Sequence, residues 1–238
     1  MKKQIIFAIA ISMMIACTNS SSADGNGKSV NTDNGKTVST PEPQEQNLSE
    51  TLIGFDDSKT GEMPVGWSNG YTGKGGLGKW EIVEDKDNKV LAQVSQKNGG
   101  YHFDVIVKDE TDYKDLEIEV DFKGVKGEED QGGGPVWRYR DADNYYVARA
   151  NPLEDNYRVY KVVDGNRKQL ASARFDIPTG EWHKIKIRMI GNHIECFYDG
   201  KKFLDVKDDT FKDSGKVGLW IKADAVTWFD DLKIVDLK

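Results

Sequence analysis

Arginine and aromatic side chains gather in the stretch GGGPVWRYRDADNYYVARAN, residues 132–151. Residues alternate between two types in VWRYR and in YYVARA, and these two runs predict the strands of a hairpin. The four loop residues between them are Asp141, Ala142, Asp143 and Asn144. With Arg140 opposite Tyr145, one face of this hairpin is cationic and the other apolar. The cationic face carries Val136, Arg138, Arg140, Tyr145, Val147, Arg149 and Asn151. The apolar face carries Trp137, Tyr139, Tyr146, Ala148 and Ala150.

The cationic face has the chemistry of a carbohydrate site. Guanidinium groups offer fixed forks of donors to hydroxyl, carboxylate or keto oxygens, and aromatic rings stack on the apolar faces of sugars. Side chains of two further predicted strands extend the face. The predicted ligand-binding residues are Arg138, Arg140, Tyr145, Arg149, Asn151, Arg158, Tyr160, Trp220 and Lys222. The alternative is a structural network in which the arginines pair with Glu117, Glu119 or Asp121.

A row of carboxylates forms the second candidate site. In DLEIEVDFKG, residues 115–124, Glu117, Glu119 and Asp121 alternate with apolar residues. Two carboxyls about 5 Å apart carry out retaining glycoside hydrolysis, so these three residues are the catalytic candidates, as acid, base or nucleophile. One-sided burial of a strand produces the same alternation, and a solvated outer face is the favoured interpretation.

Two glycine motifs resemble catalytic signatures only in their letters. GWSNG, residues 66–70, fits G-x-S-x-G, but loop sequence rather than a helix follows Ser68. GKGGLGK, residues 73–79, fits a phosphate-binding loop, but Trp80 stands where a hydroxyl residue is needed. Both segments are predicted to be loops.

Composition narrows the class of fold and of partner. The 238 residues include 40 acidic and 33 basic side chains, a formal charge of −7, which disfavours nucleic acid and anionic membrane surfaces as partners. The 24 glycines and many short alternating runs predict an all-β chain, a two-sheet antiparallel jelly-roll sandwich. We expect a monomer without an organic cofactor.

The N-terminal sequence predicts export. Lys2 and Lys3 precede an apolar run too short for a membrane span, which indicates a signal peptide over residues 1–16. The ending MMIAC resembles the lipobox of bacterial lipoproteins, which implies a lipidated Cys17. A polar, low-complexity tether is predicted over residues 17–50 and the folded domain over 51–238. The protein is therefore expected to be lipid-anchored in the bacterial cell envelope, at the outer membrane.

The C-terminal half carries a family resemblance. GEWHKIKIRMIGNHIECFYDGKKFLDV, GKVGLW and VTWFDDLKI, between residues 180 and 234, resemble concanavalin A-like lectin/glucanase domains, including laminin-G-like modules and 3-keto-disaccharide hydrolase-like domains. The resemblance implies the jelly-roll fold and, in turn, three functions that this fold supports. The first is carbohydrate binding, the second hydrolysis of a glucan or keto-disaccharide by a carboxylate of the same face, and the third protein adhesion.

The resemblance also suggests a metal. Paired aspartates stand in GFDDSKTG near the start of the domain and in WFDDLKI near its end. Similar positions in carbohydrate-binding modules hold a structural calcium ion, and carboxylate oxygens are suitable ligands for Ca²⁺. Asp56, Asp57 and Asp230 are the predicted calcium ligands. The three histidines, His102, His183 and His193, have no metal-ligand spacing.

Overall fold

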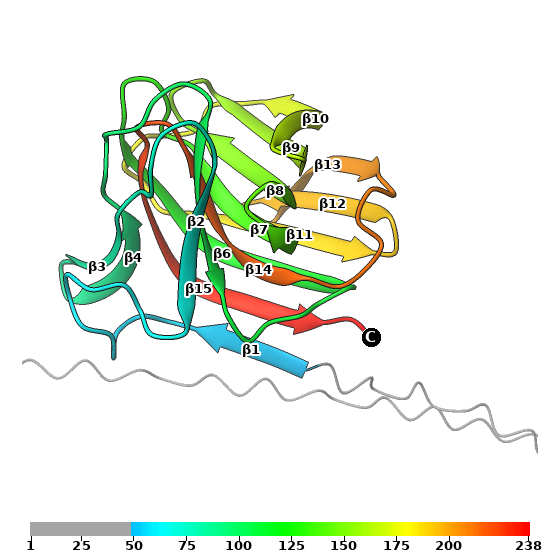
Figure 1. Cartoon of the computed structure of the whole chain (residues 1–238), viewed down its shortest axis with the longest axis horizontal. Helices are drawn as coiled ribbons and strands as arrows, with labels where there is room; N and C mark the ends of the chain where they lie inside the picture. The colour runs from blue at the N-terminus through cyan, green and yellow to red at the C-terminus, as the bar shows by residue number, and fades with distance from the viewer. Residues whose placement is uncertain (1–48) are drawn as a thin grey trace, which may run out of the picture. The chain divides into compact units, whose positions relative to one another are not determined.

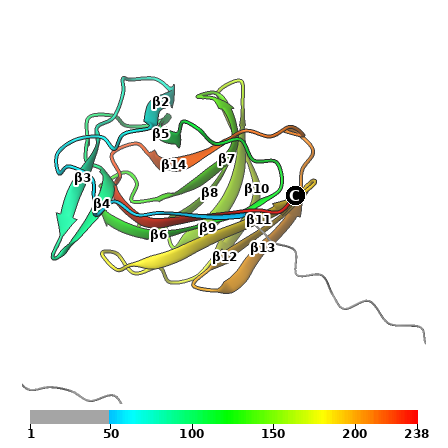
Figure 2. The same ribbon diagram turned by 90° about the horizontal axis from the view of Figure 1, so that it is seen from below.

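The computed structural model describes residues 49–238, which form a sandwich of two antiparallel sheets (Figures 1 and 2). The predicted all-β jelly-roll architecture is confirmed. Its first strand begins at Ser49, inside the segment that the sequence assigns to the tether. In this part of the chain there is no helix with the length and apolarity of a membrane span.

The first sheet, sheet A, has eight strands. They are β1 (Ser49–Ile53), β3 (Trp80–Asp85), β4 (Asn88–Gln93), β6 (Leu116–Lys126), β11 (His183–Ile190), β12 (His193–Tyr198), β13 (Lys201–Lys207) and β15 (Val226–Asp236). Their order is β13-β12-β11-β6-β15-β4-β3, and β1 pairs with the C-terminal part of β15.

The second sheet, sheet B, has seven strands. They are β2 (Trp67–Gly73), β5 (His102–Lys108), β7 (Gly133–Asp141), β8 (Asn144–Asn151), β9 (Asn156–Val163), β10 (Asn166–Arg174) and β14 (Lys216–Lys222). Their order is β10-β9-β8-β7-β14-β5-β2, and Figure 2 shows them as a curved layer over sheet A.

The main core lies between the sheets and follows the alternation in the sequence. On β6, Leu116, Ile118, Val120 and Phe122 are fully buried, whereas the residues between them are partly exposed. Trp137 on β7 meets them from sheet B and stacks on Tyr146, with ring centroids 5.6 Å apart. This burial of one face of each strand holds the two sheets together.

Sheet B also buries side chains on its concave face, turned away from sheet A. This second apolar cluster consists of Phe103, Val105, Val107, Val136, Tyr145, Val147, Tyr160, Val162 and Trp220. The sheet curls enough for its edges to meet: the Tyr101 hydroxyl, just before β5, donates to the Gly165 carbonyl in the β9–β10 turn at 3.0 Å. The Thr72 hydroxyl on β2 contacts the Tyr145 hydroxyl on β8 at 2.7 Å.

The β7–β8 hairpin contains a bulge that the sequence analysis missed. Asp141 pairs with Asn144, but Trp137 pairs with Tyr146, so three β7 residues, 138–140, face the single β8 residue Tyr145. Arg138 sits in this bulge with a left-handed φ of 46°. The bulge turns Tyr139 onto the concave face, where its ring stacks on Tyr145 at 5.8 Å. The prediction that Arg138 and Arg140 share a face with Arg149 is therefore wrong.

Candidate ligand-binding site

Arg138 and Arg140 have structural partners at the end of the sandwich. The Arg138 guanidinium is buried and donates to the carbonyls of Lys114 (2.9 Å), Phe211 (2.6 Å) and Gly191 (2.8 Å). Arg140 lies over the Phe211 ring and pairs with Asp213 at 3.0 Å. Arg138 thus ties together three loops, and neither residue belongs to the concave face.

Tyr145 and Trp220 lie on the concave face as predicted, but they are buried rather than open for stacking. Both are 0% exposed, and the Trp220 indole N–H donates to the Tyr145 hydroxyl at 3.1 Å. The guanidinium of Arg167 on β10 covers the cluster, 4.6 Å from the ring centroids of Phe103 and Tyr160. A sugar would therefore meet Arg167 before it met these rings.

Beside Arg167, Arg149 is the centre of a group of charged residues, here termed the concave ionic cluster. Its members are Asp130, Arg149, Glu154, Arg158 and Lys222. Arg149 donates to Asp130 at 2.8 Å and to Glu154 at 2.7 Å. Lys222 lies 3.3 Å from Asp130, and Arg158 lies 3.5 Å from Glu154. Strands β8, β9 and β14 thus bring together three of the predicted cations.

Further predicted residues border this cluster. Arg158 donates to the Tyr160 hydroxyl at 3.4 Å, and Tyr160 is only 4% exposed. Asn151 ends β8, where its side-chain oxygen accepts the backbone N–H groups of Gln131 (3.3 Å) and Leu153 (3.1 Å). Both lie where the sequence pattern placed them, with their polar atoms partly engaged by the protein.

The acidic members of the cluster were missed by the sequence analysis. Asp130 comes from the β6–β7 loop, which the Asp224 carboxylate fastens by accepting the backbone N–H groups of Glu128 (2.7 Å) and Asp130 (3.0 Å). Gly127 in this loop has φ 152°, and a Cβ there would lie 1.8 Å from the Asp130 carbonyl. The glycine-rich sequence GEEDQGGG is typical of a loop, but it gives no sign that this loop delivers a buried carboxylate to Arg149.

The electrostatics of the cluster keep Arg149 and Glu154 ionised. Burial lowers the pKa of Arg149, but the Asp130 and Glu154 carboxylates outweigh this effect, and the net shift is upward. Burial raises the pKa of Glu154, whereas hydrogen bonds from Asn156 and Arg149 bring it down to about 2. Glu154 is thus a fixed negative charge at neutral pH and a poor proton carrier.

Three buried donors on or beside this face have no hydrogen-bond partner within residues 49–238. They are Arg149 Nε, Arg167 Nη1 and Asn151 Nδ2. A buried donor without a hydrogen-bond partner is costly, and most buried donors in native proteins do have a partner. One of them, Arg149 Nε, belongs to the side chain that contacts the fixed carboxylate of Glu154. Donors without partners and a fixed carboxylate give this face the capacity to bind an oxygen-rich ligand.

The carboxylates Glu117, Glu119 and Asp121 lie elsewhere. They point outward from β6 on sheet A, not toward the concave face of sheet B, so the prediction that they share the arginine face is wrong. Glu117 pairs with Arg188 at 3.2 Å and Glu119 with Lys184 at 3.6 Å. Lys184 also pairs with Asp121. This outer ion-pair row corresponds to the solvated face favoured from the sequence.

The predicted calcium ligands are only partly brought together. The buried Asp230 carboxylate accepts from the Asn88 side chain at 2.7 Å, and Asp56 Oδ1 accepts the backbone N–H of neighbouring Lys89 at 3.3 Å. Burial raises the pKa of Asp230, and the carboxylates of Asp231 and Asp56 raise it further. The Lys89 ammonium, however, occupies the Asp56 carbonyl at 2.8 Å. Calcium at Asp56, Asp57 and Asp230 stays a prediction.

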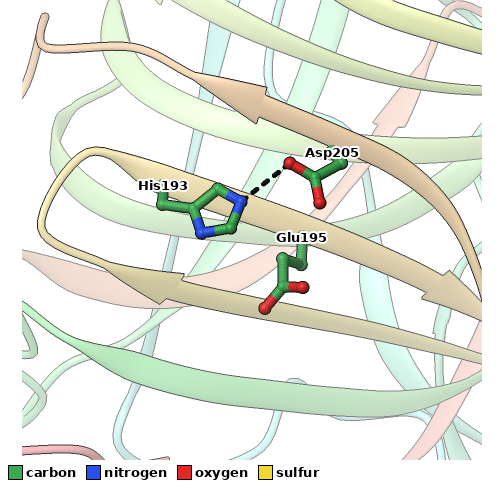
Figure 3. Close-up of side chains that lie close together, drawn as sticks. All are labelled: His193, Glu195 and Asp205. Atoms are coloured by element: carbon green, nitrogen blue, oxygen red, sulfur yellow. Dashed lines mark hydrogen bonds and ion pairs between the residues drawn. The ribbon is translucent and has the colours of Figure 1, made fainter.

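A different trio has metal-like spacing. His193 and Glu195 on β12 and Asp205 on β13 place their ligand atoms within 4.8 Å of one another (Figure 3). His193 Nε2 lies 2.7 Å from Asp205. The Lys202 ammonium already contacts Glu195 at 3.0 Å and Asp205 at 2.8 Å, and Arg188 contacts Glu195 at 3.2 Å. These cations neutralise the carboxylates, so the trio belongs to a surface ion-pair network.

Solved structures confirm the class of fold. The chain is similar to the carbohydrate-binding module CBM66 from Bacillus subtilis, at 21% identity and a TM-score of 0.57, over 71% of this chain and 94% of that one. Domain 4 of the GH43 extracellular arabinanase AbnA from Geobacillus stearothermophilus, solved with arabinotriose, matches at 13% identity and a TM-score of 0.52, over 80% and 94%. These similarities show the fold of the domain, a two-sheet antiparallel β-sandwich.

A match to a family model identifies the family of this chain. Residues 54–235 match the model of the 3-keto-alpha-glucoside-1,2-lyase-like domain, and the chain belongs to this family. No curated protein matches the chain at a significant level.

Proposed function

We propose that this protein binds a carbohydrate at the concave ionic cluster of sheet B. The observation that carries the proposal is the set of buried donors without partners, Arg149 Nε, Arg167 Nη1 and Asn151 Nδ2. Sugar hydroxyl oxygens accept such donors and also donate to carboxylates such as Glu154. A polyhydroxylated ligand therefore matches both kinds of group at once.

The fold supports the same proposal. Two of the similar structures carry carbohydrate recognition in their names, one as a binding module and one as a domain bound to arabinotriose. Fold similarity does not transfer a function by itself. The site geometry therefore carries more weight here than the fold.

A glycan array followed by calorimetry on each hit tests this function in the full chain. Arg158→Gln and Lys222→Gln alter cations at the accessible margin of the cluster, and each should weaken binding about tenfold or more, because a charge-assisted hydrogen bond is lost. The matched control is Arg188→Gln in the outer ion-pair row, which should bind as wild type does. Absence of any glycan hit, or equal loss in all three variants, would reject the proposed site.

Turnover is the second candidate function, and the family match favours it. The family description points to 3-keto-α-glucosides as the compounds to try. Incubation of the protein with a 3-keto-α-glucoside and analysis of the products decides between binding and turnover. If products form, Glu154→Gln should retain the rate, because a carboxylate with a pKa of about 2 is a weak base. A protein-adhesion module, by contrast, would give protein ligands and no glycan hits.

We further propose that the domain is held in the cell envelope by lipidated Cys17. The signal peptide 1–16, Cys17 and nearly all of the tether lie outside the described residues, so the proposal is supported by sequence alone. Cys17→Ser should move the protein from the membrane fraction to the soluble fraction, because the acyl chains would be missing. Unchanged membrane partition of the variant would reject the lipoprotein assignment.

A further inference from the structure

Arg167 differs from the other cations of the concave face because it has no ionic partner. Arg149, Arg158 and Lys222 each have a carboxylate within 4.0 Å, whereas Arg167 has none among residues 49–238. Its Nη1 is buried and also lacks a hydrogen-bond acceptor there. The closest groups around this partly buried charge are therefore aromatic rings rather than a carboxylate.

Those rings hold the guanidinium in place, and the Arg167 residue stays partly exposed. Arg167 lies 4.6 Å from the centroids of Phe103 and Tyr160 and 5.8 Å from that of Trp220. The negative faces of the rings attract the cation. A guanidinium stacked in this way keeps its N–H donors in its own plane, where they match the paired oxygens of an oxyanion.

The surroundings make the positive charge of Arg167 less favourable than it would be in water. Burial lowers the pKa of the Arg167 guanidinium, and the Arg149 cation lowers it further, although Asp130 acts in the opposite direction. An anionic ligand would neutralise this charge at the site, whereas a neutral hydroxyl would supply only an acceptor.

We propose that Arg167 is an anion-binding residue of the concave face, so that the protein prefers sugars carrying an oxyanion, a carboxylate or a sulfate, over their neutral counterparts. This inference rests on the proposed carbohydrate binding and names the class of sugar. Arg149, by contrast, already has its two terminal nitrogens engaged by Asp130 and Glu154.

Matched ligand pairs test the preference in the full chain. The probes are a galacturonic acid trisaccharide with its methyl ester, a sulfated galactose oligosaccharide with its desulfated form, and further acid/neutral pairs on a glycan array. For the class of oxyanion that the site accepts, the acidic member should bind about tenfold or more tightly at low salt. The preference should shrink as salt is raised.

Variants at position 167 assign the preference to one side chain. Arg167→Met keeps apolar contact with the rings and should abolish the acid preference, and Arg167→Lys should restore part of it. The control Lys168→Gln removes the same charge from the next, exposed residue of β10 and should leave the preference intact. Circular dichroism and the melting temperature of each variant establish that it is folded.

The outcomes separate this inference from the proposed function. Equal binding of acidic and neutral members, or an acid preference that survives in folded Arg167→Met, overturns the inference and leaves carbohydrate binding in place. Absence of binding to every glycan rejects the proposed function, and the inference with it. If only the carboxylate pairs or only the sulfate pairs show the preference, that result identifies the oxyanion.

Discussion

Two groups of charged residues in this protein, similar in composition, differ in their physical setting. The outer ion-pair row of sheet A joins Glu117, Glu119 and Asp121 to Lys184, Lys186 and Arg188, with side chains that are 28–43% exposed. In the concave ionic cluster, the Arg149 and Asp130 side chains are 2% and 0% exposed. Solvent screens the first group and is excluded from the centre of the second. Burial, rather than residue type, therefore separates a solvated surface from a candidate site.

The two settings imply different energies. Exposed ion pairs contribute about 0–1 kcal/mol, because water and salt weaken the attraction and the side chains lose entropy. Removing one partner of a buried pair costs about 3–5 kcal/mol, because the other charge stays buried without compensation. Substitutions in the two groups should therefore differ severalfold in their effect on the free energy of unfolding.

The largest effect is expected at Arg149. Arg149→Met should lower the free energy of unfolding by about 3–5 kcal/mol, because the Asp130 carboxylate would lose its main partner. The double variant Arg149→Met/Asp130→Asn should recover part of the loss. Urea unfolding monitored by fluorescence measures both. A loss below about 1 kcal/mol in the single variant would mean that the buried pair behaves like an exposed one.

This expectation revises the sequence-based one. From the sequence, Arg138→Ala and Arg149→Ala should weaken binding with little change in stability, and only Trp137→Ala, on the apolar face, should cost about 3–5 kcal/mol. Both arginines are 1% exposed and hydrogen-bonded to several protein groups. Substituting either of them should therefore destabilise the fold about as much as a substitution in the core. Alternation assigns residues to the two faces of a strand, but it does not reveal that sheet curvature buries both.

The site itself was predictable only in part. The alternation on β8, β9 and β14 correctly placed Arg149, Arg158 and Lys222 together. Strands β8 and β9 pair without a register shift, and β14 pairs regularly with β7 near Lys222, beyond the shift at its start. The bulge at 138–140 turns Arg138 and Arg140 away from the concave face, and a bulge has no reliable signature in this sequence. Asp130 and Arg167 depend on a loop conformation and on the curl of sheet B. Both are tertiary features, which local periodicity does not encode.

A partly buried pair outside the site, Lys161 and Asp208, tests whether the degree of burial accounts for the difference. Asp208 follows β13 and accepts from Lys161 on β9 at 2.6 Å and from the Tyr146 hydroxyl at 2.7 Å. Burial raises the pKa of Asp208, but hydrogen bonds from Lys161, Thr210 and Tyr146 lower it to about 2. Asp208→Asn should cost about 2 kcal/mol at neutral pH, from the difference between this pKa and that of an unfolded aspartate.

The pH dependence of that cost has a definite sign. A carboxyl whose pKa is lowered by folding contributes stability above its unfolded pKa, near 4, and loses it as the pH falls toward 2. The stability difference between wild type and Asp208→Asn should therefore shrink between pH 4 and pH 2. Asp213→Asn, in an exposed pair with Arg140, is the control and should show little difference at either pH. A constant difference across this range would contradict the assigned ion pair.

A smaller effect is expected from calcium. If Asp56, Asp57 and Asp230 bind the ion, it would relieve the repulsion that raises the pKa of Asp230. At free calcium ten times the dissociation constant, the folded state should gain about 1.4 kcal/mol. Melting curves with chelator and with added Ca²⁺ measure this gain, and Asp230→Asn should abolish it. Identical melting curves up to millimolar calcium would reject calcium binding by these three aspartates.

The smallest effect is expected in the outer ion-pair row. Glu117→Gln, Glu119→Gln and Asp121→Asn should each change the free energy of unfolding by about 0.5 kcal/mol or less, since every carboxylate is partly exposed and shares its cations with neighbours. Glycan affinity and any turnover of a 3-keto-α-glucoside should also stay at the wild-type level, because this row lies on the outer face of sheet A, on the opposite side of the sandwich from the concave face of sheet B. Loss of turnover in one of these variants, with affinity retained, would move the chemistry to sheet A and make the outer ion-pair row the active site.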